Sequence, residues 1–555
     1  MSMTIVLFDR NVILALLSLL VSLVLLWGYL RSVKRSMLLA GASADQPLPS
    51  AENASPVTAA PPAAPLRIGP FSAPTYEASE SVWRGPRRTV AIQIAAGLTY
   101  AAGVTLAWLW LIAKVANWHE FAWQGFVVFT LFFAWPLVVV IGLVATVSWR
   151  GMALVVLVYL ALLLPAALYQ MQGTAVTPAL FAFNWWTING PATLFVLAFL
   201  VRPIRAMGPI VAALVVASAA GVFGTAGALN ETMIEWISSA AASLGFRGSF
   251  GGIAASLIVF GSAALAAALV GYIALRGLGR LYRAQWLSDQ SLQLDAVWLT
   301  FAVLQSPIQL PYAGLASFLI YKLVAALGQR SLGFANAAGR SAPRLLLLRV
   351  FSLGTRSRRL FDVFARLWRY SGSVRMIAGP DLANATVEPH EFLDFLAGRL
   401  QRRFIAGPTA LGRRLAETQL QRDPDGRFRV STFFCHADTW QMVLRRLARD
   451  SDVVLMDLRG FMQANQGCVF ELHELLNAVP LGNVLLVVDR TTDERFLTEV
   501  LTQGWAKIGP ASPNWSDPAP LVRLYRLKFA GAQGIGGLVS ALSKLHGPSP
   551  AAAGA

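Results

Sequence analysis

Charged and amide side chains are concentrated in one stretch of the C-terminal part, where an apolar run ends and a helical pattern begins. Asp457 and Arg459 end the run SDVVLMDLR, Asn465 and Glu471 follow it, and Asp489 ends the next apolar run, VLLVVD. Carboxylates and a guanidinium bind polar or anionic ligands, and a helix carboxylate can act as a general acid or base. The pattern therefore predicts a ligand-binding site formed by Asp457, Arg459, Asn465 and Asp489, with Glu471 as the candidate catalytic residue.

A glycine-containing loop provides a second candidate site. Ser352, Gly354, Thr355 and Arg356 follow an apolar run and open a helical pattern whose first turn is basic. The N–H groups at the start of a helix bind phosphate, whereas arginine in a first turn opposes the helix dipole. This favours an anionic partner, either a ligand or a lipid headgroup. The alternative is that Thr355 only caps the helix, and the Gly-Lys-Ser/Thr element of a P-loop is missing.

Other residues of types that could bind a ligand or a metal give weaker signals. The glycine-rich segment 531–537 is not G-x-G-x-x-G and is not followed by the acidic residue of a dinucleotide-binding fold. Cys435 and Cys468 show no ligand-like spacing, so they predict neither a disulfide framework nor a zinc site. We therefore expect no metal and no resident cofactor, and NAD or a related nucleotide is the class of ligand to test.

Apolar runs and amphipathic stretches alternate throughout the C-terminal part. Strands are predicted at 345–351, 374–378, 428–434, 453–458, 484–488 and 521–527. Helices are predicted near 355–370, 388–403, 438–449, 465–478, 493–503 and 534–545. Continuously apolar strands separated by helices favour a parallel sheet that is covered on both faces. Residues 341–546 are therefore predicted to form a cytosolic α/β domain, flavodoxin-like or Rossmann-like, whose ligands bind beyond the carboxyl ends of the strands. Residues 547–555 are expected to be a disordered tail.

The helix predicted at 465–478 carries Cys-x-x-Glu-Leu, in which Cys468 precedes Glu471. With the strand and loop before it, this motif resembles TIR (Toll/interleukin-1 receptor-type) domains. The resemblance covers residues 451–489 well and the remaining domain only at the level of fold. It implies that Glu471 matches the glutamate with which enzymatic TIR domains cleave the nicotinamide–ribose bond of NAD. Gly467 stands where that family usually has tryptophan, and the alternative role for Glu471 is an ion pair with a nearby arginine.

The composition of the whole chain is typical of a membrane protein. Its 555 residues are 56% hydrophobic and 14% charged, and the mean hydropathy is +0.56. Soluble domains carry about 25% charged residues, so much of this surface is expected to face lipid. The formal charge of +17 would suggest nucleic acid in a soluble protein. In a membrane protein the commoner reason is Lys and Arg retained on the cytoplasmic side, so we expect a lipid bilayer and no nucleic acid as partner.

Several apolar segments are long enough to cross a bilayer, which takes about 20 residues of helix. They lie at 11–30, 89–113, 123–148, 152–171, 183–201, 208–229 and 250–275. Residues 1–36 are interpreted as an uncleaved first helix with its N-terminus outside, because the basic cluster follows the apolar core. The Ala/Pro/Ser-rich segment 37–88 is expected to be a disordered cytoplasmic linker, and 89–276 a six-helix transmembrane bundle.

Lysine and arginine are distributed unevenly between the loops. Those assigned to the inner loops are Arg31, Lys34, Arg35, Arg67, Arg84, Arg87, Arg88, Arg150, Arg202, Arg205, Arg276, Arg280 and Arg283, against Arg10, Lys114 and Arg247 outside. This bias predicts a bacterial inner (plasma) membrane protein with its N-terminus outside and its C-terminal domain in the cytoplasm.

Residues 277–340 are expected to connect the two parts. Within them the run 296–321 is uncharged and long enough for an eighth span, but two prolines and two glutamines divide it between positions 305 and 311. Each piece has the length of a buried or interfacial helix. We therefore interpret the run as two helices that lie on the inner membrane surface.

Three functions remain open. The first is a domain that binds or senses a nucleotide-like ligand or a protein partner, or forms a homo-oligomer, and so signals without catalysis. The second is an NAD glycohydrolase that uses Glu471. The third is a transporter with a cytosolic regulatory domain, which the near absence of ionisable residues within the expected spans disfavours.

Overall fold

The chain folds into two compact units, a helical unit that includes Thr89–Gly333 and an α/β unit that includes Leu30–Arg88, Phe334–Thr386 and Ala397–Ala555. The computed structural model describes residues 24, 27–29, 31–32, 64–71, 80–116, 123–145, 149–172, 176–197, 213, 217, 231–243, 245, 249–307, 309–310, 312–332, 342–349, 354–378, 394–395, 398, 403–436, 439–527 and 532–545. The expected spans at 11–30 and 208–229 lie almost entirely outside these residues, and the tail 547–555 lies outside them completely.

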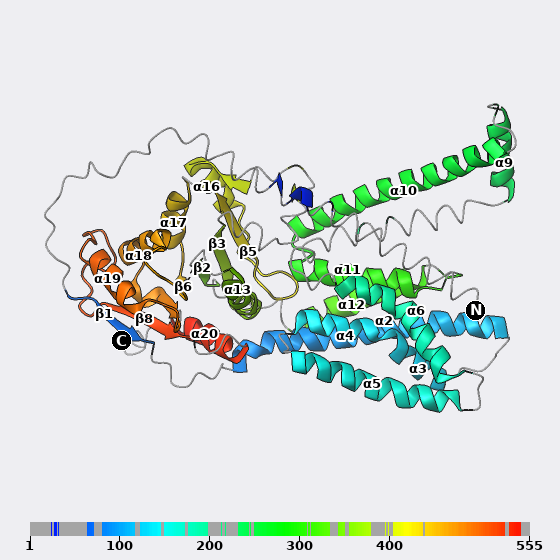
Figure 1. The fold of residues 1–555 in the computed structure, drawn as a ribbon, viewed down its shortest axis with the longest axis horizontal. Coiled ribbons are helices and arrows are strands. Elements are labelled where there is room, and N and C mark those ends of the chain that lie inside the picture. The colour runs from blue at the N-terminus through cyan, green and yellow to red at the C-terminus, as the bar shows by residue number, and fades with distance from the viewer. Residues whose placement is uncertain are drawn as a thin grey trace. The chain divides into compact units, whose positions relative to one another are not determined.

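Long apolar helices make up the helical unit (Figure 1). They are α2 (Glu80–Ala116), α3 (Trp123–Phe133), α4 (Trp135–Val144), α5 (Trp149–Met171), α6 (Pro178–Leu197), α9 (Glu231–Ser243), α10 (Ser249–Arg283), α11 (Asp289–Gln305) and α12 (Ala313–Ser331). Within the described residues, four segments are long and apolar enough to cross a membrane: Glu80–Ala116, Trp123–Val144, Trp149–Met171 and Leu265–Arg283. They overlap four of the expected spans, and Leu265–Arg283 shares residues 265–275 with the span expected at 250–275. The expected span at 183–201 overlaps α6, which is not among the four.

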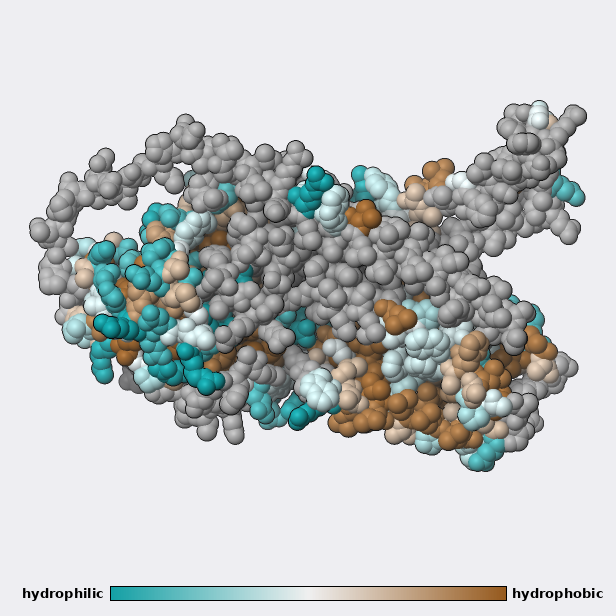
Figure 2. Space-filling view, viewed as in Figure 1, coloured by the Kyte–Doolittle hydropathy of each residue, from teal (hydrophilic) through white to brown (hydrophobic). Residues whose placement is uncertain are grey.

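Much of the described outer surface of the helical unit is apolar. Figure 2 shows hydrophobic residues gathered over part of it, and α5 illustrates the pattern, with Leu154, Leu157, Leu162 and Leu168 each more than half exposed. Soluble monomers seldom expose a contiguous apolar surface of this kind. The helices are therefore compatible with a lipid environment.

The connector expected at 277–340 differs from the prediction. Helix α10 continues to Arg283, past the expected end of the bundle. Helix α11 then packs against α4, α6 and α12, and its side chains from Ala296 to Phe301 are all buried. A helix that is apolar and enclosed on every side belongs to the interior of a bundle. Residues up to Gly333 are accordingly part of the helical unit, not a peripheral connection.

An eight-stranded parallel sheet forms the centre of the α/β unit (Figure 1). Its strands are β1 (Arg67–Pro70), β2 (Arg344–Arg349), β3 (Ser373–Ala378), β4 (Phe404–Ile405), β5 (Val430–Cys435), β6 (Val453–Asp457), β7 (Val484–Val488) and β8 (Leu521–Arg526). The order across the sheet is β1-β8-β7-β6-β2-β3-β5-β4. All six predicted strands are present within two residues of their expected bounds, and the predicted parallel arrangement is confirmed.

Helices cover both faces of the sheet. They are α13 (Gly354–Trp368), α16 (Pro408–Ala416), α17 (Trp440–Arg449), α18 (Gln466–Ala478), α19 (Glu494–Trp505) and α20 (Ala532–Leu545), with a 3-10 turn at Leu481–Asn483. Leu346 and Leu348 of β2 belong to one apolar core with α17, α18 and α19. Leu345 and Leu347 point to the other face, because side chains alternate along a strand, and they are also buried. Helices α13 and α20 pack together outside the first core.

Strand β1 and the first turns of α2 correct part of the expectation that 37–88 is a disordered linker, whereas residues 37–63 and 72–79 lie outside the described residues. Arg67–Pro70 pairs in parallel with β8, in the register Arg67 to Leu521. Arg67 N donates to Pro520 O at 2.9 Å, and the Trp505 indole donates to Ala64 O at 3.0 Å. Ile68 packs against the core beside α19. The Ala/Pro-rich composition hides this short strand, because its stabilising contacts lie hundreds of residues away in the sequence.

Candidate functional site

The strand order identifies where a ligand would bind on such a sheet. If only β2, β3, β5, β6, β7 and β8 are numbered along the chain, the order across the sheet is 3-2-1-4-5-6, which is the Rossmann order and not the flavodoxin order 2-1-3-4-5. After β2 the chain moves one way across the sheet, and after β6 it moves the other way. In open α/β sheets, ligands generally bind beyond the carboxyl ends of the strands at such a reversal point. The candidate site is therefore the shared end of β2 and β6.

Two arginines and an aspartate occupy the ends of these two strands. Arg349, the last residue of β2, is opposite Asp457, the last residue of β6. Arg459 turns back onto Asp457 and donates from Nε to Oδ1 and from Nη2 to Oδ2, both at 2.8 Å. Asp457 is 1% exposed and Arg459 is 3% exposed. Burial alone would lower the pKa of Arg459, but the hydrogen bonds and charge of Asp457 raise it above its ordinary value.

Asn465 shapes the loop after β6 and does not cap the following helix. The loop turns at Gly460, whose φ of 71° is in the left-handed region that glycine adopts easily. Asn465 occupies the N-cap position of α18, but its side chain accepts from Met462 N at 3.0 Å and makes no capping hydrogen bond. Its role here is to close that loop.

Glu471 lies on the buried face of α18, next to the end of β2. Cys468, one turn earlier on the same face, is 3.9 Å through its Sγ from Arg349 O. Glu471 is 2% exposed, and no described residue donates to its Oε2 atom. Burial raises the pKa of the Glu471 carboxyl to about 8, an effect that the positive charge of Arg349 only partly offsets. At neutral pH this side chain is therefore mainly a neutral acid that can donate a hydrogen bond.

Asp489 flanks this cluster from the end of β7. Its Oδ1 accepts from Thr491 N at 2.9 Å, and its own N–H donates to Thr492 Oγ1 at 3.1 Å. These bonds fix a turn that begins directly after the strand. Asp489 also contributes negative charge at Arg459, which places it at the same edge of the sheet. The predicted residues Asp457, Arg459, Glu471 and Asp489 thus come together.

The loop after β2 is only partly described. Ser352 lies outside the described residues, and Gly354, Thr355 and Arg356 are described as the backbone of the first turn of α13. The predicted helix is present, and it begins directly beyond the end of β2. The N–H groups of its first turn are the groups in this segment that can bind an anion.

Arg349 is the functional candidate that the sequence reasoning missed. The apolar run predicts a strand that continues to residue 351, whereas β2 ends at Arg349. A lone charge at the end of the run RLLLLR was the available signal. With Arg349 the cluster contains two guanidiniums, two carboxylates and one protonated acid. It can bind a ligand that presents both anionic oxygens and hydrogen-bond acceptors. Among the described residues, no three His, Cys, Asp or Glu side chains are placed to hold a metal ion.

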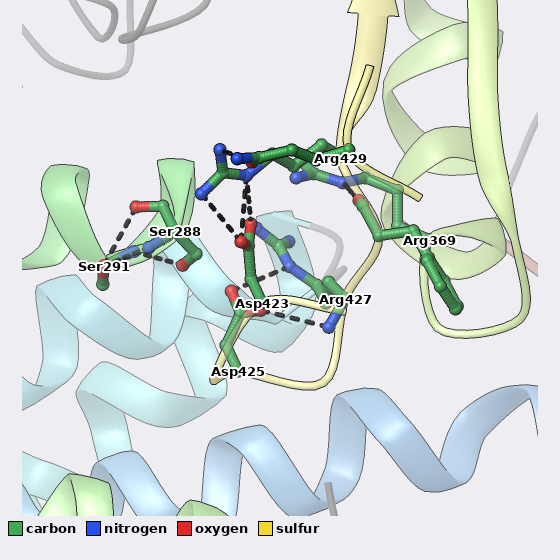
Figure 3. A network of polar contacts seen from close by, with 9 residues as sticks. Ser288, Ser291, Arg369, Asp423, Asp425, Arg427 and Arg429 are labelled. Atoms are coloured by element: carbon green, nitrogen blue, oxygen red, sulfur yellow. Dashed lines mark hydrogen bonds and ion pairs between the residues drawn. The ribbon is translucent and has the colours of Figure 1, made fainter. Parts of the chain in front are cut away.

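A second polar network lies at the amino ends of the strands, at the end of the sheet opposite to this site (Figure 3). Arg429 Nε donates to Asp423 Oδ1 at 2.9 Å, and Arg427 Nε approaches Asp425 Oδ2 at 3.3 Å. Arg369 Nε donates to Phe428 O at 2.6 Å. These residues precede β5 and β3, so they lie at the amino ends of the strands. These ion pairs and the bond to the Phe428 carbonyl hold a tight turn, as a structural cluster does.

Comparisons of the chain with protein-family models, with curated proteins and with solved structures find no match.

Proposed function

We propose that this protein is a multi-pass protein of the bacterial inner membrane whose cytoplasmic α/β unit binds a nucleotide-like anionic ligand and signals without catalysis. The ligand occupies the crevice at the carboxyl ends of β2 and β6. The membrane part anchors this sensor, with the N-terminus of the chain outside.

Two observations support the membrane part of the proposal. Four described segments have the length and composition of spans, and the outward faces of helices such as α5 are apolar. The excess of arginine in the loops assigned to the inside supports the orientation.

The observation that carries ligand binding is the buried carboxyl of Glu471. Its Oε2 atom has no described donor or acceptor, although it lies at the reversal point of the strand order beside Arg349. An unsatisfied buried polar atom costs about 1–3 kcal/mol, so it is retained where a ligand or a function compensates. The helix N-terminus of α13 supplies the donors for an anion at the same edge.

Charge complementarity limits the class of ligand. The Asp457 carboxylate neutralises Arg459 through two hydrogen bonds, and the positive charge of Arg349 acts on Glu471. The N–H groups of the first turn of α13 add positive potential. A protonated Glu471 donates to an acceptor, such as a carbonyl or a ring nitrogen. A ligand with a phosphate at one end and a hydrogen-bonding ring at the other fits both requirements, as NAD, ADP-ribose and other nucleotides do.

Isothermal titration calorimetry on the full chain in lipid nanodiscs tests the proposal. NAD, ADP-ribose, ATP and GTP are titrated separately, and at least one is expected to bind. Glu471→Gln keeps a donor at this position and should retain binding, whereas Glu471→Leu should abolish it. Glu474→Gln, one turn further along α18 and paired with Arg445 at 3.0 Å, is the matched control. If none of the four nucleotides gives a heat of binding, the proposal that the ligand is a nucleotide is refuted.

An NAD glycohydrolase that uses Glu471 is the second candidate, and the resemblance to TIR domains around Cys468 and Glu471 supports it. The raised pKa of Glu471, about 8, also suits a general acid at neutral pH. Incubation of the full chain with NAD distinguishes the two functions. Nicotinamide release that is lost in Glu471→Gln supports the enzyme, and binding without release supports the sensor.

A further inference from the structure

We propose that α11 and α12 form a helical hairpin inserted into the bilayer, whose α12 face contacts lipid acyl chains. The proposal rests on the membrane location proposed above. It replaces the expectation of two helices on the membrane surface, and it assigns lipid as the partner of a helix that is not among the four apolar spans.

The exposed face of α12 has the composition of a lipid-facing surface. From Leu315 to Leu327 its exposed residues are all apolar: Leu315, Ala316, Leu319, Ile320, Leu323, Ala326 and Leu327. These twelve steps of helix rise about 18 Å. A helix that lies on a membrane surface shows a charged or polar face to water. Here the polar residues Ser317 and Tyr321 are buried on the opposite side.

Contacts with α2 show that the hairpin runs alongside a candidate span. Tyr321 Oη donates to Gln93 Oε1 at 2.8 Å, near the start of the apolar part of α2. Further along α2, Trp108 Nε1 donates to Gln305 O at 2.8 Å, at the end of α11. Gln93 and Trp108 are fifteen positions apart, which corresponds to about 22 Å along the helix axis. The hairpin therefore extends through most of the thickness of a hydrocarbon core of about 30 Å.

Three polar residues of the hairpin, Gln305, Asp295 and Lys322, find their partners within the helical unit. Gln305 accepts from Tyr100 Oη at 2.9 Å and donates to Asn189 Oδ1 at 2.8 Å, so it joins α2, α6 and α11. Lys322 Nζ lies 2.9 and 2.8 Å from the two carboxylate oxygens of Asp295, which neutralises both charges. Pairing of this kind is what allows ionisable residues to occur inside a membrane protein.

Close backbone packing closes the apex of the hairpin. Gly314 N donates to Ser306 Oγ at 2.9 Å, and Ser306 Oγ donates to Ala302 O at 2.6 Å. A Cβ atom on Gly314 would lie 1.9 Å from Ala302 O, so only glycine fits. Irregular backbone is tolerated at membrane depth where it is enclosed by protein in this way.

Both ends of the hairpin carry the residues expected at the inner membrane surface. Arg280 and Arg283 precede α11, and Arg330 ends α12. Ser288 and Ser291 cap the start of α11, with Ser291 N donating to Ser288 Oγ at 3.0 Å and Ser288 N donating to Ser291 Oγ at 2.8 Å (Figure 3). The chain therefore enters and leaves on one side, and the exposed residues Gln309 and Tyr312 reach toward the other side.

Cysteine labelling in sealed membrane vesicles tests the hairpin. The native Cys435 and Cys468 are buried, so the unsubstituted chain serves as the blank. Gln309→Cys probes the tip, Arg330→Cys the base and Leu319→Cys the α12 face. Leu162→Cys is the matched control on α5, one of the four apolar segments, where the side chain is similarly exposed. A membrane-impermeant maleimide should label position 330 from the cytoplasmic side only. The impermeant reagent should not label position 319 from either side, as at position 162. A lipid-soluble maleimide should label both positions.

Labelling of the cysteine at position 309 distinguishes an inserted hairpin from one that lies on the membrane surface. Labelling at 309 from the side opposite to 330, or from neither side before detergent is added, supports insertion. Labelling of 309 and 319 from the same side as 330 would overturn the hairpin. Extraction of the same membranes with alkaline carbonate is the independent check on the proposed location. Release of the unsubstituted chain into the supernatant refutes the membrane protein itself, whereas retention with cytoplasmic labelling of 319 refutes the hairpin alone.

Discussion

Asp457 and Arg459, separated only by Leu458, form a two-point ion pair at the carboxyl end of β6, with both side chains almost completely buried. The pair fixes the loop between β6 and α18 and so positions Glu471 beside Arg349. Its desolvated charges make the site rigid and sensitive to substitution, because neither partner can return to water without unfolding the loop.

Removal of one member of this pair should destabilise the α/β unit strongly. Asp457→Ala leaves the Arg459 guanidinium buried without its counter-charge, so the free energy of unfolding should fall by about 3–5 kcal/mol. Urea denaturation followed by tryptophan fluorescence measures this change. Asp450→Ala, which breaks the exposed pair with Arg446, is the control and should cost less than about 1 kcal/mol. Equal losses in the two variants would contradict the structural role of the Asp457–Arg459 pair.

Glu471 should make the stability of the α/β unit fall as the pH rises. The folded pKa is raised to about 8 from an ordinary value of 4.5, so between these pH values the folded state holds a proton that the unfolded state releases. The contribution is fully present below pH 4.5 and is lost as pH rises through 8. The slope is at most about 1.4 kcal/mol per pH unit. Urea titrations at several pH values should show a flatter profile for Glu471→Gln, whereas Glu474→Gln should keep the wild-type slope.

The edge strand β1 should be displaced by a single charge on its inward face. Ile68 packs against the core beside α19, so Ile68→Asp buries a carboxylate or expels the strand from β8. We expect faster hydrogen exchange at the Arg67 and Phe71 amides, which donate to Pro520 O and Leu524 O. Arg67→Asp, at an exposed position, should leave both amides protected. Unchanged exchange in Ile68→Asp would show that β1 does not depend on this contact.

The ion pair between buried Asp295 and half-buried Lys322 should contribute to stability mainly by neutralising the Asp295 carboxylate. Lys322→Met leaves the Asp295 carboxylate without its partner and should lower the thermal stability of the full chain in detergent. The double variant Asp295→Leu with Lys322→Met should recover much of that loss, because no unpaired carboxylate then remains in the interior. If the double variant is less stable than Lys322→Met, the two charges are not coupled as the structure indicates.

The sequence alone determined the local elements and the kind of sheet. Unbroken apolar runs such as VLLVV fixed β7 at Val484–Val488, and helical stretches between such runs implied parallel strands. Those signals are local, since side-chain periodicity and burial on both faces can be recognised from the types of consecutive residues. For the same reason Asp457, Arg459 and Glu471 were identified as residues at the carboxyl edge of the sheet.

Only the tertiary structure decided the strand order, the role of Arg349 and the addition of β1. Each depends on which distant segments meet: Arg349 is opposite Asp457, and Arg67 is opposite Leu521. Likewise, the run 296–321 was divided by prolines and glutamines and was interpreted as surface helices, but Gln305 is satisfied by Tyr100 and Asn189 from other helices. A polar residue is costly in an apolar interior only until a partner reaches it. Whether a buried polar residue finds a hydrogen-bond partner depends on packing between remote parts of the chain, and a local sequence pattern does not contain that information.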